Sequence, residues 1–329
     1  MKINNYSWIQ QKLHKFALSS KFIRESAFDL ESFLFEGSTN WDNNIFISGL
    51  ARSGTTILLN ALHASDKFSS LSYDDMPFIL APNVWSKILL TKTHKKAIYR
   101  AHGDGLKVTT NSPEAFEEVF WKTFEHNKPE SLEKFKVFIK LINKKYGKKR
   151  YISKNNQNIN RIDFLSKNFP NSKILIPFRE PSQQAYSLLN QHKRFIYLTN
   201  HDTFISDYMN WIGHKEFGPN YIPLFNEGLA HTDTQNINHW LEQWYLSYKK
   251  CKNIFKDTSN ICFVCYEEIC HNNDYWQEIL KYLDINKSYN FNFMESKKNI
   301  SLDTDINLYN KTSFLYDQIR EISIKKILG

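Results

Sequence analysis

One short loop near the start of the chain combines two glycines, three hydroxyl side chains and a cation. It reads Gly49-Leu50-Ala51-Arg52-Ser53-Gly54-Thr55-Thr56, between an apolar stretch and a segment with helical spacing. Glycines let a backbone fold tightly around an anion, and the N–H groups at the start of a helix point toward it. The loop therefore predicts a binding site for a phosphate or a related anion, with Arg52 supplying positive charge.

The same loop disfavours ATP as the ligand. A nucleotide-triphosphatase loop needs a lysine at the position of Thr55, where it reaches the outer phosphates. Enzymes that transfer phosphoryl groups on such a loop depend on that charge and on bound magnesium. A kinase or other ATP-using enzyme is thus one alternative, and a noncatalytic anion-binding protein of the same fold is another.

A second pair of residues points to another anion. Arg179 follows the apolar stretch from Ser172 to Phe178, and Ser187 comes eight positions later. Glu180 and Pro181 open a helix between them. If the arginine ends a strand and the serine lies two turns into the helix, both side chains converge on one anion at the carboxyl edge of a sheet.

In chain order, the two motifs resemble those of sulfotransferases that use 3′-phosphoadenosine 5′-phosphosulfate, and are nearest in style to the tyrosylprotein and glycan branches. The loop of that family commonly reads Lys or Arg followed by Ser-Gly-Thr-Thr, which matches Arg52 to Thr56. The resemblance implies that the 5′-phosphosulfate is bound by Arg52, Ser53, Gly54, Thr55 and Thr56. It also implies that Arg179 and Ser187 bind the 3′-phosphate, which ATP lacks.

Three further positions match by resemblance alone. Lys154, in Ser153-Lys154-Asn155, stands where these enzymes place a lysine that reaches the transferring sulfuryl group, although the acidic or proline residue that often follows is missing. Tyr266 follows a strand where the family often has Tyr-Glu near the nucleotide. Lys297, or its neighbour Lys298, falls in the late loop that closes over the donor.

Sulfuryl transfer needs cations and a base. An acceptor oxygen attacks in line while the bridging oxygen leaves with negative charge, which Arg52 and Lys154 are suited to stabilise without a metal. The base must lie within hydrogen-bond reach of the acceptor hydroxyl. Asp74 and Asp75 lie where tyrosylprotein and many glycan sulfotransferases carry a catalytic carboxylate, and Asp75 is our first choice. His102 is the rival, because an imidazole titrates near neutrality.

Another group of acids is not expected to take part in catalysis. Glu114, Glu117 and Glu118 fall in the run from Ser112 to Trp121, which predicts a capped helix. We expect their carboxylates to be solvated.

Strands and helices alternate through the middle of the chain. Apolar, β-rich stretches predict strands at 44–50, 151–154, 172–178 and 260–266. Helical segments are predicted at 56–63, 161–168 and 239–255, the last with Trp240, Trp244, Tyr248 and Cys251 as core packing. Strands separated by helices imply right-handed crossovers. The predicted fold is therefore a three-layer α/β/α fold with a central parallel sheet and a P-loop-like loop.

Three segments lie outside this pattern. Residues 1–40 predict a helical extension and residues 291–329 a loop and tail, on either side of an α/β domain at 41–290. Residues 195–234 contain glycines and prolines among aromatic residues. They predict a helical and irregular insertion that serves as a lid over the acceptor.

Charge and cysteine content limit the ligands that the chain is expected to bind. The 43 Lys and Arg residues exceed the 34 Asp and Glu residues, and the net charge of +9 favours anionic ligands. Nucleic acid is not expected as a partner, because the chain has no long basic run, zinc-finger spacing or RNA-binding aromatic signature. Cys262 and Cys265 have zinc-ligand spacing, but no second pair follows, so no metal is expected.

The expected acceptor is a saccharide or another small hydroxylated molecule. Four cysteines read as free thiols, which fits a reducing compartment. Charged residues interrupt the first 18 positions, so we expect neither a signal peptide nor a transmembrane segment. Together these features predict a cytoplasmic enzyme.

Overall fold

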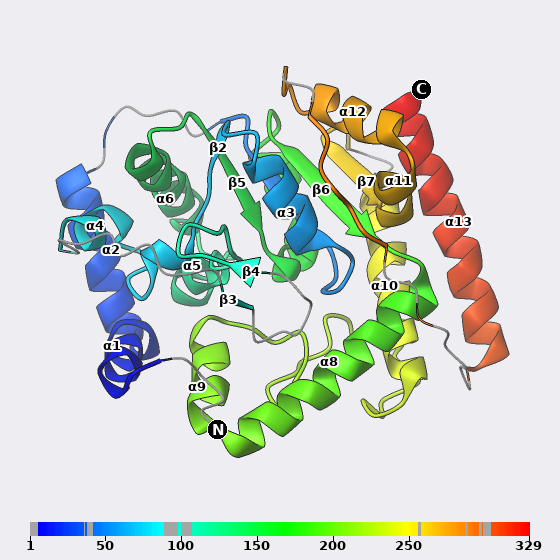
Figure 1. The fold of residues 1–329 in the computed structure, drawn as a ribbon, viewed down its shortest axis with the longest axis horizontal. Helices are drawn as coiled ribbons and strands as arrows, with labels where there is room; N and C mark the ends of the chain where they lie inside the picture. The colour runs from blue at the N-terminus through cyan, green and yellow to red at the C-terminus, as the bar shows by residue number, and fades with distance from the viewer. Residues whose placement is uncertain are drawn as a thin grey trace.

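A five-stranded parallel sheet forms the centre of the computed structural model, which describes residues 6–35, 37, 42–88, 98–99, 107–255, 258–286, 289–295, 298 and 304–329. The strand order is β2-β5-β1-β6-β7 (Figure 1). The strands are β1 (Ile45–Ile47), β2 (Phe68–Ser69), β5 (Arg150–Lys154), β6 (Lys173–Phe178) and β7 (Ile261–Cys265). A separate antiparallel pair consists of β3 (Ile98–Tyr99) and β4 (Lys107–Val108).

Both faces of the sheet are buried, because alternate side chains of each strand enter different hydrophobic clusters. In β1, Ile45 and Ile47 pack on one face with Leu58 of α3 (Thr55–His63). Phe46 packs on the other face, where its ring lies 6.1 Å from that of Phe135 in α6 (Ser131–Tyr146). The molecule therefore has the predicted three-layer α/β/α fold around a parallel sheet.

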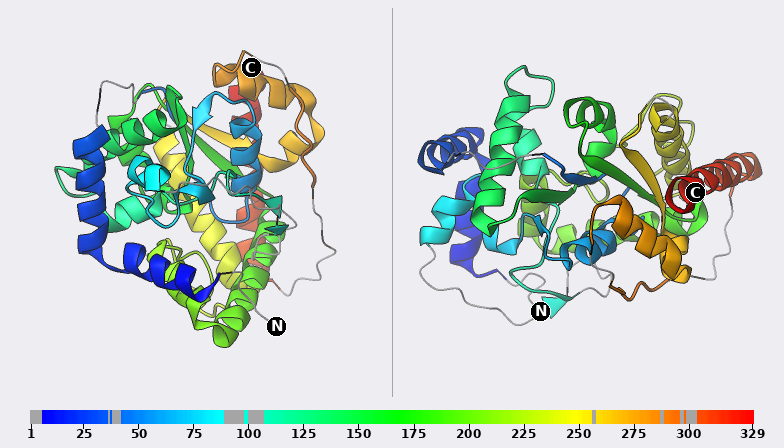
Figure 2. Two further views of the ribbon diagram at one scale, coloured as in Figure 1. Left: turned by 60° about the vertical axis from the view of Figure 1, so that its left-hand side comes forward. Right: turned by 90° about the horizontal axis from the view of Figure 1, so that it is seen from above.

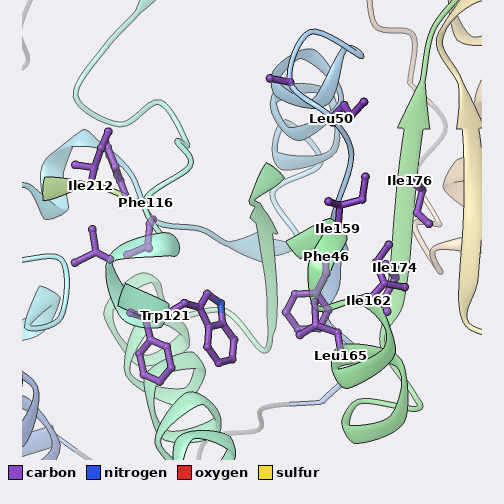
Figure 3. Packing of buried hydrophobic residues seen from close by; sticks show 14 of the residues in the cluster. Phe46, Leu50, Phe116, Trp121, Ile159, Ile162, Leu165, Ile174, Ile176 and Ile212 are labelled. Atoms are coloured by element: carbon purple, nitrogen blue, oxygen red, sulfur yellow. The ribbon is translucent and has the colours of Figure 1, made fainter. Parts of the chain in front are cut away.

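Helices cover the two faces in sets that come from different parts of the chain (Figure 2). The first face is covered by α3, α11 (Tyr266–His271) and α12 (Asn273–Tyr282). The second face is covered by α5 (Glu118–Phe124), α6, α7 (Ile162–Asn168), α8 (Pro181–His201) and α10 (Ile237–Phe255). Figure 3 shows the second-face cluster around Phe46, Ile162 and Ile174.

The predicted strands and helices of the central domain are present, with shorter ends in most strands. Two helices of the domain, α6 with 16 residues and α12 with 10, are absent from the prediction, and the other elements absent from it are short. Strand β2 has two residues, and the one-turn helices η1 (Tyr73–Asp75) and η2 (Asn156–Asn160) lie in segments that read as polar loops. The aromatic stripe of α10 is core packing as predicted, because Trp240, Trp244, Tyr248 and Cys251 are all buried.

The expected N-terminal helical extension consists of α1 (Trp8–Ser19) and α2 (Lys21–Phe35). Ser7 starts α1 with a capping box, in which its hydroxyl accepts from the Gln10 N–H and its own N–H donates to the Gln10 side chain. In α2, the buried Glu31 accepts hydrogen bonds from the backbone and side chain of Asn83 at the start of α4 (Pro82–Ile88), at 2.8 and 2.6 Å. The extension is thus joined to the domain by buried polar contacts.

The expected lid has less irregular structure than its glycines and prolines indicate. Helix α8 continues through Phe195 to His201, and α9 (Thr203–Trp211) follows. Only residues 212–236 are irregular, and their aromatic side chains pack against neighbouring helices. The Phe217 ring lies 5.0 Å from that of Phe195, and the Tyr221 ring lies 4.7 Å from that of Trp240.

The expected C-terminal tail contains a long helix, α13 (Ile306–Leu328). Its buried side chains include Leu308, Leu315 and Ile319, and it packs along α10 and β7. The helix covers the outer side of β7, the strand at the end of the sheet.

Candidate active site

The predicted phosphate loop joins the end of β1 to the start of α3. Arg52 and Gly54 both have left-handed backbone conformations, with φ of 70° and 88°. Gly54 is the N-cap of α3, and a glycine has no side chain that could cap the first N–H groups of the helix. These N–H groups are therefore directed to whatever lies outside the loop, as an anion site requires.

Arg52 connects the loop to the second predicted motif. Its Nε donates a hydrogen bond of 3.0 Å to the Ser187 hydroxyl in α8. The two residues come from motifs that the family resemblance assigns to different phosphates of one donor. Their direct contact places the two motifs side by side.

Tyr266 closes the same site from the end of β7. A Cβ atom at Gly54 would lie 2.4 Å from the tyrosine ring, so the ring rests directly on the loop. The guanidinium of Arg179 lies 5.9 Å from the centre of the ring. Burial raises the pKa of Tyr266, and its hydroxyl donates to the Met294 carbonyl at 3.0 Å. Arg179, Tyr266 and the loop thus meet at the carboxyl ends of β1, β6 and β7.

Side chains beneath the loop hold its backbone in place. Ser53 is fully buried, and its hydroxyl donates to the Leu50 carbonyl at 2.8 Å, so this side chain shapes the loop from inside. Gln184 donates to the Ala51 carbonyl at 3.1 Å and accepts from the Trp244 indole at 3.0 Å. Gln184 was not predicted from the sequence, although its position one turn after Glu180, at the start of the predicted helix, was the available signal.

Lys154 is the last residue of β5 and lies beside the end of β1. It is paired in register with Ile47, and the next residue, Asn155, donates its N–H to the Ile47 carbonyl at 3.0 Å. Lys154 is only 8% exposed. A lysine is seldom buried to this degree without nearby negative charge.

The predictions that residues 112–121 form a capped helix and that Glu114, Glu117 and Glu118 are solvated are wrong. Helix α5 begins only at Glu118 and has no side-chain cap, and the Glu118 side chain is 17% exposed and paired with Arg161. Glu117 is fully buried, and its carboxylate accepts hydrogen bonds from Tyr151, Trp121 and Asn158 at 3.1, 3.1 and 2.7 Å. Glu114 is 7% exposed and accepts from a tyrosine hydroxyl. The carboxylates are buried because partners from other parts of the chain supply donors that replace water.

Glu118 contacts Asn155, the residue that follows Lys154. Its carboxylate pairs with Arg161 at the start of α7 and accepts from the Asn155 side chain at 2.8 Å. Burial raises the pKa of Glu118, whereas Arg161 lowers it. The residue that follows Lys154 is thereby tied to α5 and α7.

The two aspartates proposed as bases have different surroundings. Asp75 is fully buried and accepts from the Ser72 N–H and the Tyr146 hydroxyl, both at 2.7 Å. Its second oxygen lies 2.5 Å from the Lys145 ammonium. Asp74 is partly exposed. His102, the rival base, lies outside the described residues.

The late loop approaches the donor side through one described residue. The backbone of Lys298 pairs with the Gln183 side chain at 2.9 and 3.0 Å, close to the start of α8. Lys297, the first choice for this loop, lies outside the described residues. The contact brings the late loop to the helix that carries Ser187.

Two further observations concern metal binding and membrane-spanning helices. Within these ranges, no three His, Cys, Asp or Glu side chains are grouped as a metal ion would require. Among the same residues, no helix combines the length and hydropathy needed to cross a bilayer. The four cysteines are free thiols, three of them buried.

Comparison with known proteins identifies the family. The model of the sulfotransferase family matches residues 44–288, which span the sheet, the loop from Gly49 to Thr56, Arg179, Ser187 and Tyr266. The chain belongs to the sulfotransferase family. This sulfotransferase is therefore an enzyme of sulfuryl transfer, and its loop, Arg179 and Ser187 lie within the part that defines the family.

Solved structures include similar proteins. The crystal structure of sulfotransferase STF9 from Mycobacterium avium is 12% identical, with a TM-score of 0.47, and the match covers 96% of this chain and 80% of that one. Sulfotransferase STF1 from Mycobacterium tuberculosis H37Rv is 10% identical, with a TM-score of 0.46, and the match covers 98% and 86% of the two chains. A search of curated protein sequences finds no match.

Proposed function

We propose that this sulfotransferase takes its sulfuryl group from 3′-phosphoadenosine 5′-phosphosulfate and transfers it to a hydroxyl or amine of a saccharide or another small hydroxylated molecule. The observation that carries the proposal is the 3.0 Å hydrogen bond between Arg52 and Ser187. A donor with phosphates on both its 5′ and 3′ positions needs two adjacent anion sites. The loop with Arg52 provides the first, and Arg179 with Ser187 provides the second.

The transfer follows from these positions. The acceptor oxygen forms a bond to sulfur while the bond from sulfur to the bridging oxygen breaks, and that electron pair leaves on the 5′-phosphate of 3′-phosphoadenosine 5′-phosphate. Arg52 and Lys154 stabilise the negative charge on the sulfuryl and bridging oxygens. The N–H groups at the start of α3 add to this stabilisation at the phosphate. The acceptor proton passes to a base.

We place Asp74 ahead of Asp75 and His102 as that base. Asp75 has both carboxylate oxygens engaged by Ser72, Tyr146 and Lys145, which favours a structural role. Asp74 is on the same turn and is partly exposed, so it can reach an acceptor hydroxyl without breaking a buried contact. His102 stays a candidate, because an imidazole is a suitable proton acceptor at neutral pH.

The proposed acceptor side is formed by the irregular part of the lid, residues 212–236. This segment packs on α8 and α10 next to the donor motifs, so an acceptor held beneath it would face the loop. We further propose a cytoplasmic location, since four free thiols suit a reducing compartment.

Calorimetric titration tests the donor. The ligands are 3′-phosphoadenosine 5′-phosphate, ADP without magnesium, and ATP with magnesium. We expect the first to bind at least ~10-fold more tightly than ADP, because the 3′-phosphate adds a charge-assisted contact of about 1.5–3 kcal/mol. A preference for magnesium and ATP would overturn the proposal in favour of phosphoryl transfer, and binding of the first ligand would justify a screen of hydroxylated acceptors.

A further inference from the structure

The irregular part of the lid reaches the segment that follows Lys154. Glu216 is in this part, and its carboxylate lies 3.0 Å from His214 Nδ1 and accepts from the Gln157 side chain at 3.4 Å. Gln157 is three residues beyond Lys154, in the turn that leaves β5. A lid carboxylate is therefore fixed next to the end of the strand that carries the proposed catalytic lysine.

The backbone of this lid turn is held closely against α5. Gly213 has φ of 78°, and a Cβ atom there would lie 2.6 Å from the Glu118 side chain. Ile212 belongs to the same core cluster as Phe116, just before α5 (Figure 3). The position of Glu216 is thus set by packing on both sides of the turn.

The surroundings of Glu216 favour its charged form. Burial alone would raise its pKa, but His214 and then Lys154 stabilise the charged form, and the pKa of Glu216 is lowered to about 2. A group with so low a pKa is a poor proton acceptor near neutrality. Its side chain is 8% exposed, so the charge acts in surroundings where water screens it little.

We propose that Glu216 is a positioning residue for Lys154, so that the lid over the acceptor also orients and charges the lysine that acts on the sulfuryl group. This inference rests on the proposed function of Lys154. The lysine is 8% exposed, and a nearby carboxylate favours its cationic form against the cost of burial. Among the described residues, the titratable groups next to Glu216 include His214 on its own segment and Glu118 on α5, which is paired with Arg161.

The first test replaces Glu216 by glutamine and follows formation of 3′-phosphoadenosine 5′-phosphate from the donor, with an acceptor from the screen and with water alone. We expect kcat to fall at least ~10-fold while the affinity for 3′-phosphoadenosine 5′-phosphate changes by less than about twofold. The alkaline limb of kcat should move to lower pH by about 1 unit, because loss of the carboxylate lets burial favour the neutral amine.

The matched control is Glu321→Gln. This glutamate is exposed on α13, outside the lid, and we expect wild-type kcat and pH dependence. Glu216→Asp keeps the charge and should restore the position of the alkaline limb. Wild-type turnover and an unchanged alkaline limb in Glu216→Gln would overturn the proposal.

A second readout needs no turnover. The pH dependence of Lys154 acetylation by acetic anhydride, followed by mass spectrometry, reports how readily the ammonium loses its proton. In Glu216→Gln the labelling profile should shift by about 1 unit to lower pH. In His214→Asn it should shift to higher pH, because the carboxylate of Glu216 then interacts with Lys154 alone. An unchanged profile in both variants contradicts the role of Glu216, whether or not the donor binds. Failure of the donor titration with shifted labelling profiles would instead contradict the proposed function.

A double-mutant cycle separates positioning from general stability. In a Lys154→Met background, Glu216→Gln should have little further effect on turnover. If it lowers turnover by the same factor as in the wild type, the carboxylate acts through the fold and the proposal is wrong. Should Glu216→Gln not fold, His214→Asn and Glu216→Asp still decide the outcome through the labelling profile.

Discussion

The proposed donor half and the proposed acceptor half of this site are built from different kinds of contact. The donor half is a backbone loop at a helix start, completed by residues that follow β6 and β7 and joined by the bond from Arg52 to Ser187. The acceptor half is a group of buried charges, Glu118 with Arg161 and Glu216 with His214, that come from segments distant in the chain. Anion binding therefore depends on local geometry, whereas the acceptor side depends on tertiary packing.

The largest expected effect tests whether the acceptor half supplies the base. Asp74→Asn should lower kcat by about 10²–10⁴-fold with unchanged affinity for 3′-phosphoadenosine 5′-phosphate, because only proton transfer is removed. Asp75→Asn should instead lower the free energy of unfolding by about 3 kcal/mol, since Lys145 loses its buried partner. A turnover assay measures the effect of Asp74→Asn, and chemical denaturation measures the effect of Asp75→Asn.

His102→Asn completes this comparison. If Asp74→Asn keeps full turnover and His102→Asn loses it, the histidine is the base. If all three variants keep full turnover on a known acceptor, none of these residues accepts the proton.

The second-largest effect is expected from a substitution that disrupts the loop proposed to bind the donor. Gly54→Ala places a methyl group 2.4 Å from the Tyr266 ring at a positive φ, so we expect affinity for 3′-phosphoadenosine 5′-phosphate to fall by about 100-fold, measured by calorimetry. Gly147→Ala is the matched control, because its φ is 63° but nothing lies within 4 Å of the added carbon. Equal loss of donor affinity in both variants would show that backbone strain alone is responsible.

A smaller effect is expected at the second anion site. Arg179→Ala should weaken binding of 3′-phosphoadenosine 5′-phosphate by about 10–100-fold, through loss of a charge-assisted contact of about 1.5–3 kcal/mol. Binding of ADP should change much less, because ADP has no 3′-phosphate. Arg194→Ala, an exposed position on α8, serves as the control. Unchanged affinity in Arg179→Ala would remove this residue from the donor site.

The smallest expected effect concerns how the lid is held at low pH. Burial lowers the pKa of His192 to about 4, with His239 and Lys193 acting in the same direction, and the Gly218 N–H donates to its Nδ1 at 3.1 Å. The unfolded chain, with an ordinary histidine pKa of about 6.5, binds more protons between these values. Stability should therefore fall as the pH drops from about 6.5 to 4.

His192→Asn keeps an acceptor for the Gly218 N–H but does not titrate. The loss of unfolding free energy between pH 7 and pH 5, measured by urea denaturation, should be smaller than in the wild type by about 1–2 kcal/mol. His201→Asn, an exposed histidine on the same helix, should retain the wild-type loss. A wild-type pH dependence in His192→Asn would show that the histidine is not responsible.

The difference between the two halves also explains what could be predicted from the sequence. The position of the loop between a strand and a helix was predictable, because its glycines, cation and hydroxyls cluster directly after an apolar run and before a helical one. The parallel sheet was predictable because its strands are short apolar runs separated by helices. The burial of Glu117 was not, because Tyr151 and Asn158 are its neighbours only in the folded chain.

The C-terminal helix carried a sequence signal, whereas the buried glutamate of the lid carried none. In α13, the buried residues Leu308, Thr312, Leu315, Ile319, Ser323 and Ile327 recur at three- and four-residue intervals, which is helical periodicity weakened by polar members. Glu216 lies among lid residues of mixed polarity, where no local pattern indicates burial. Its importance depends on Gln157 and Lys154, which only the tertiary structure brings near.

The contact between Gly54 and the Tyr266 ring has a consequence for the evolution of this chain. The ring occupies the space that a side chain at position 54 would need, so a larger residue at position 54 requires a smaller one at position 266. Among homologues, the two positions should vary together despite their distance in the sequence. A larger residue in the loop should be accompanied by a smaller one after β7, as a correlated pair in an alignment.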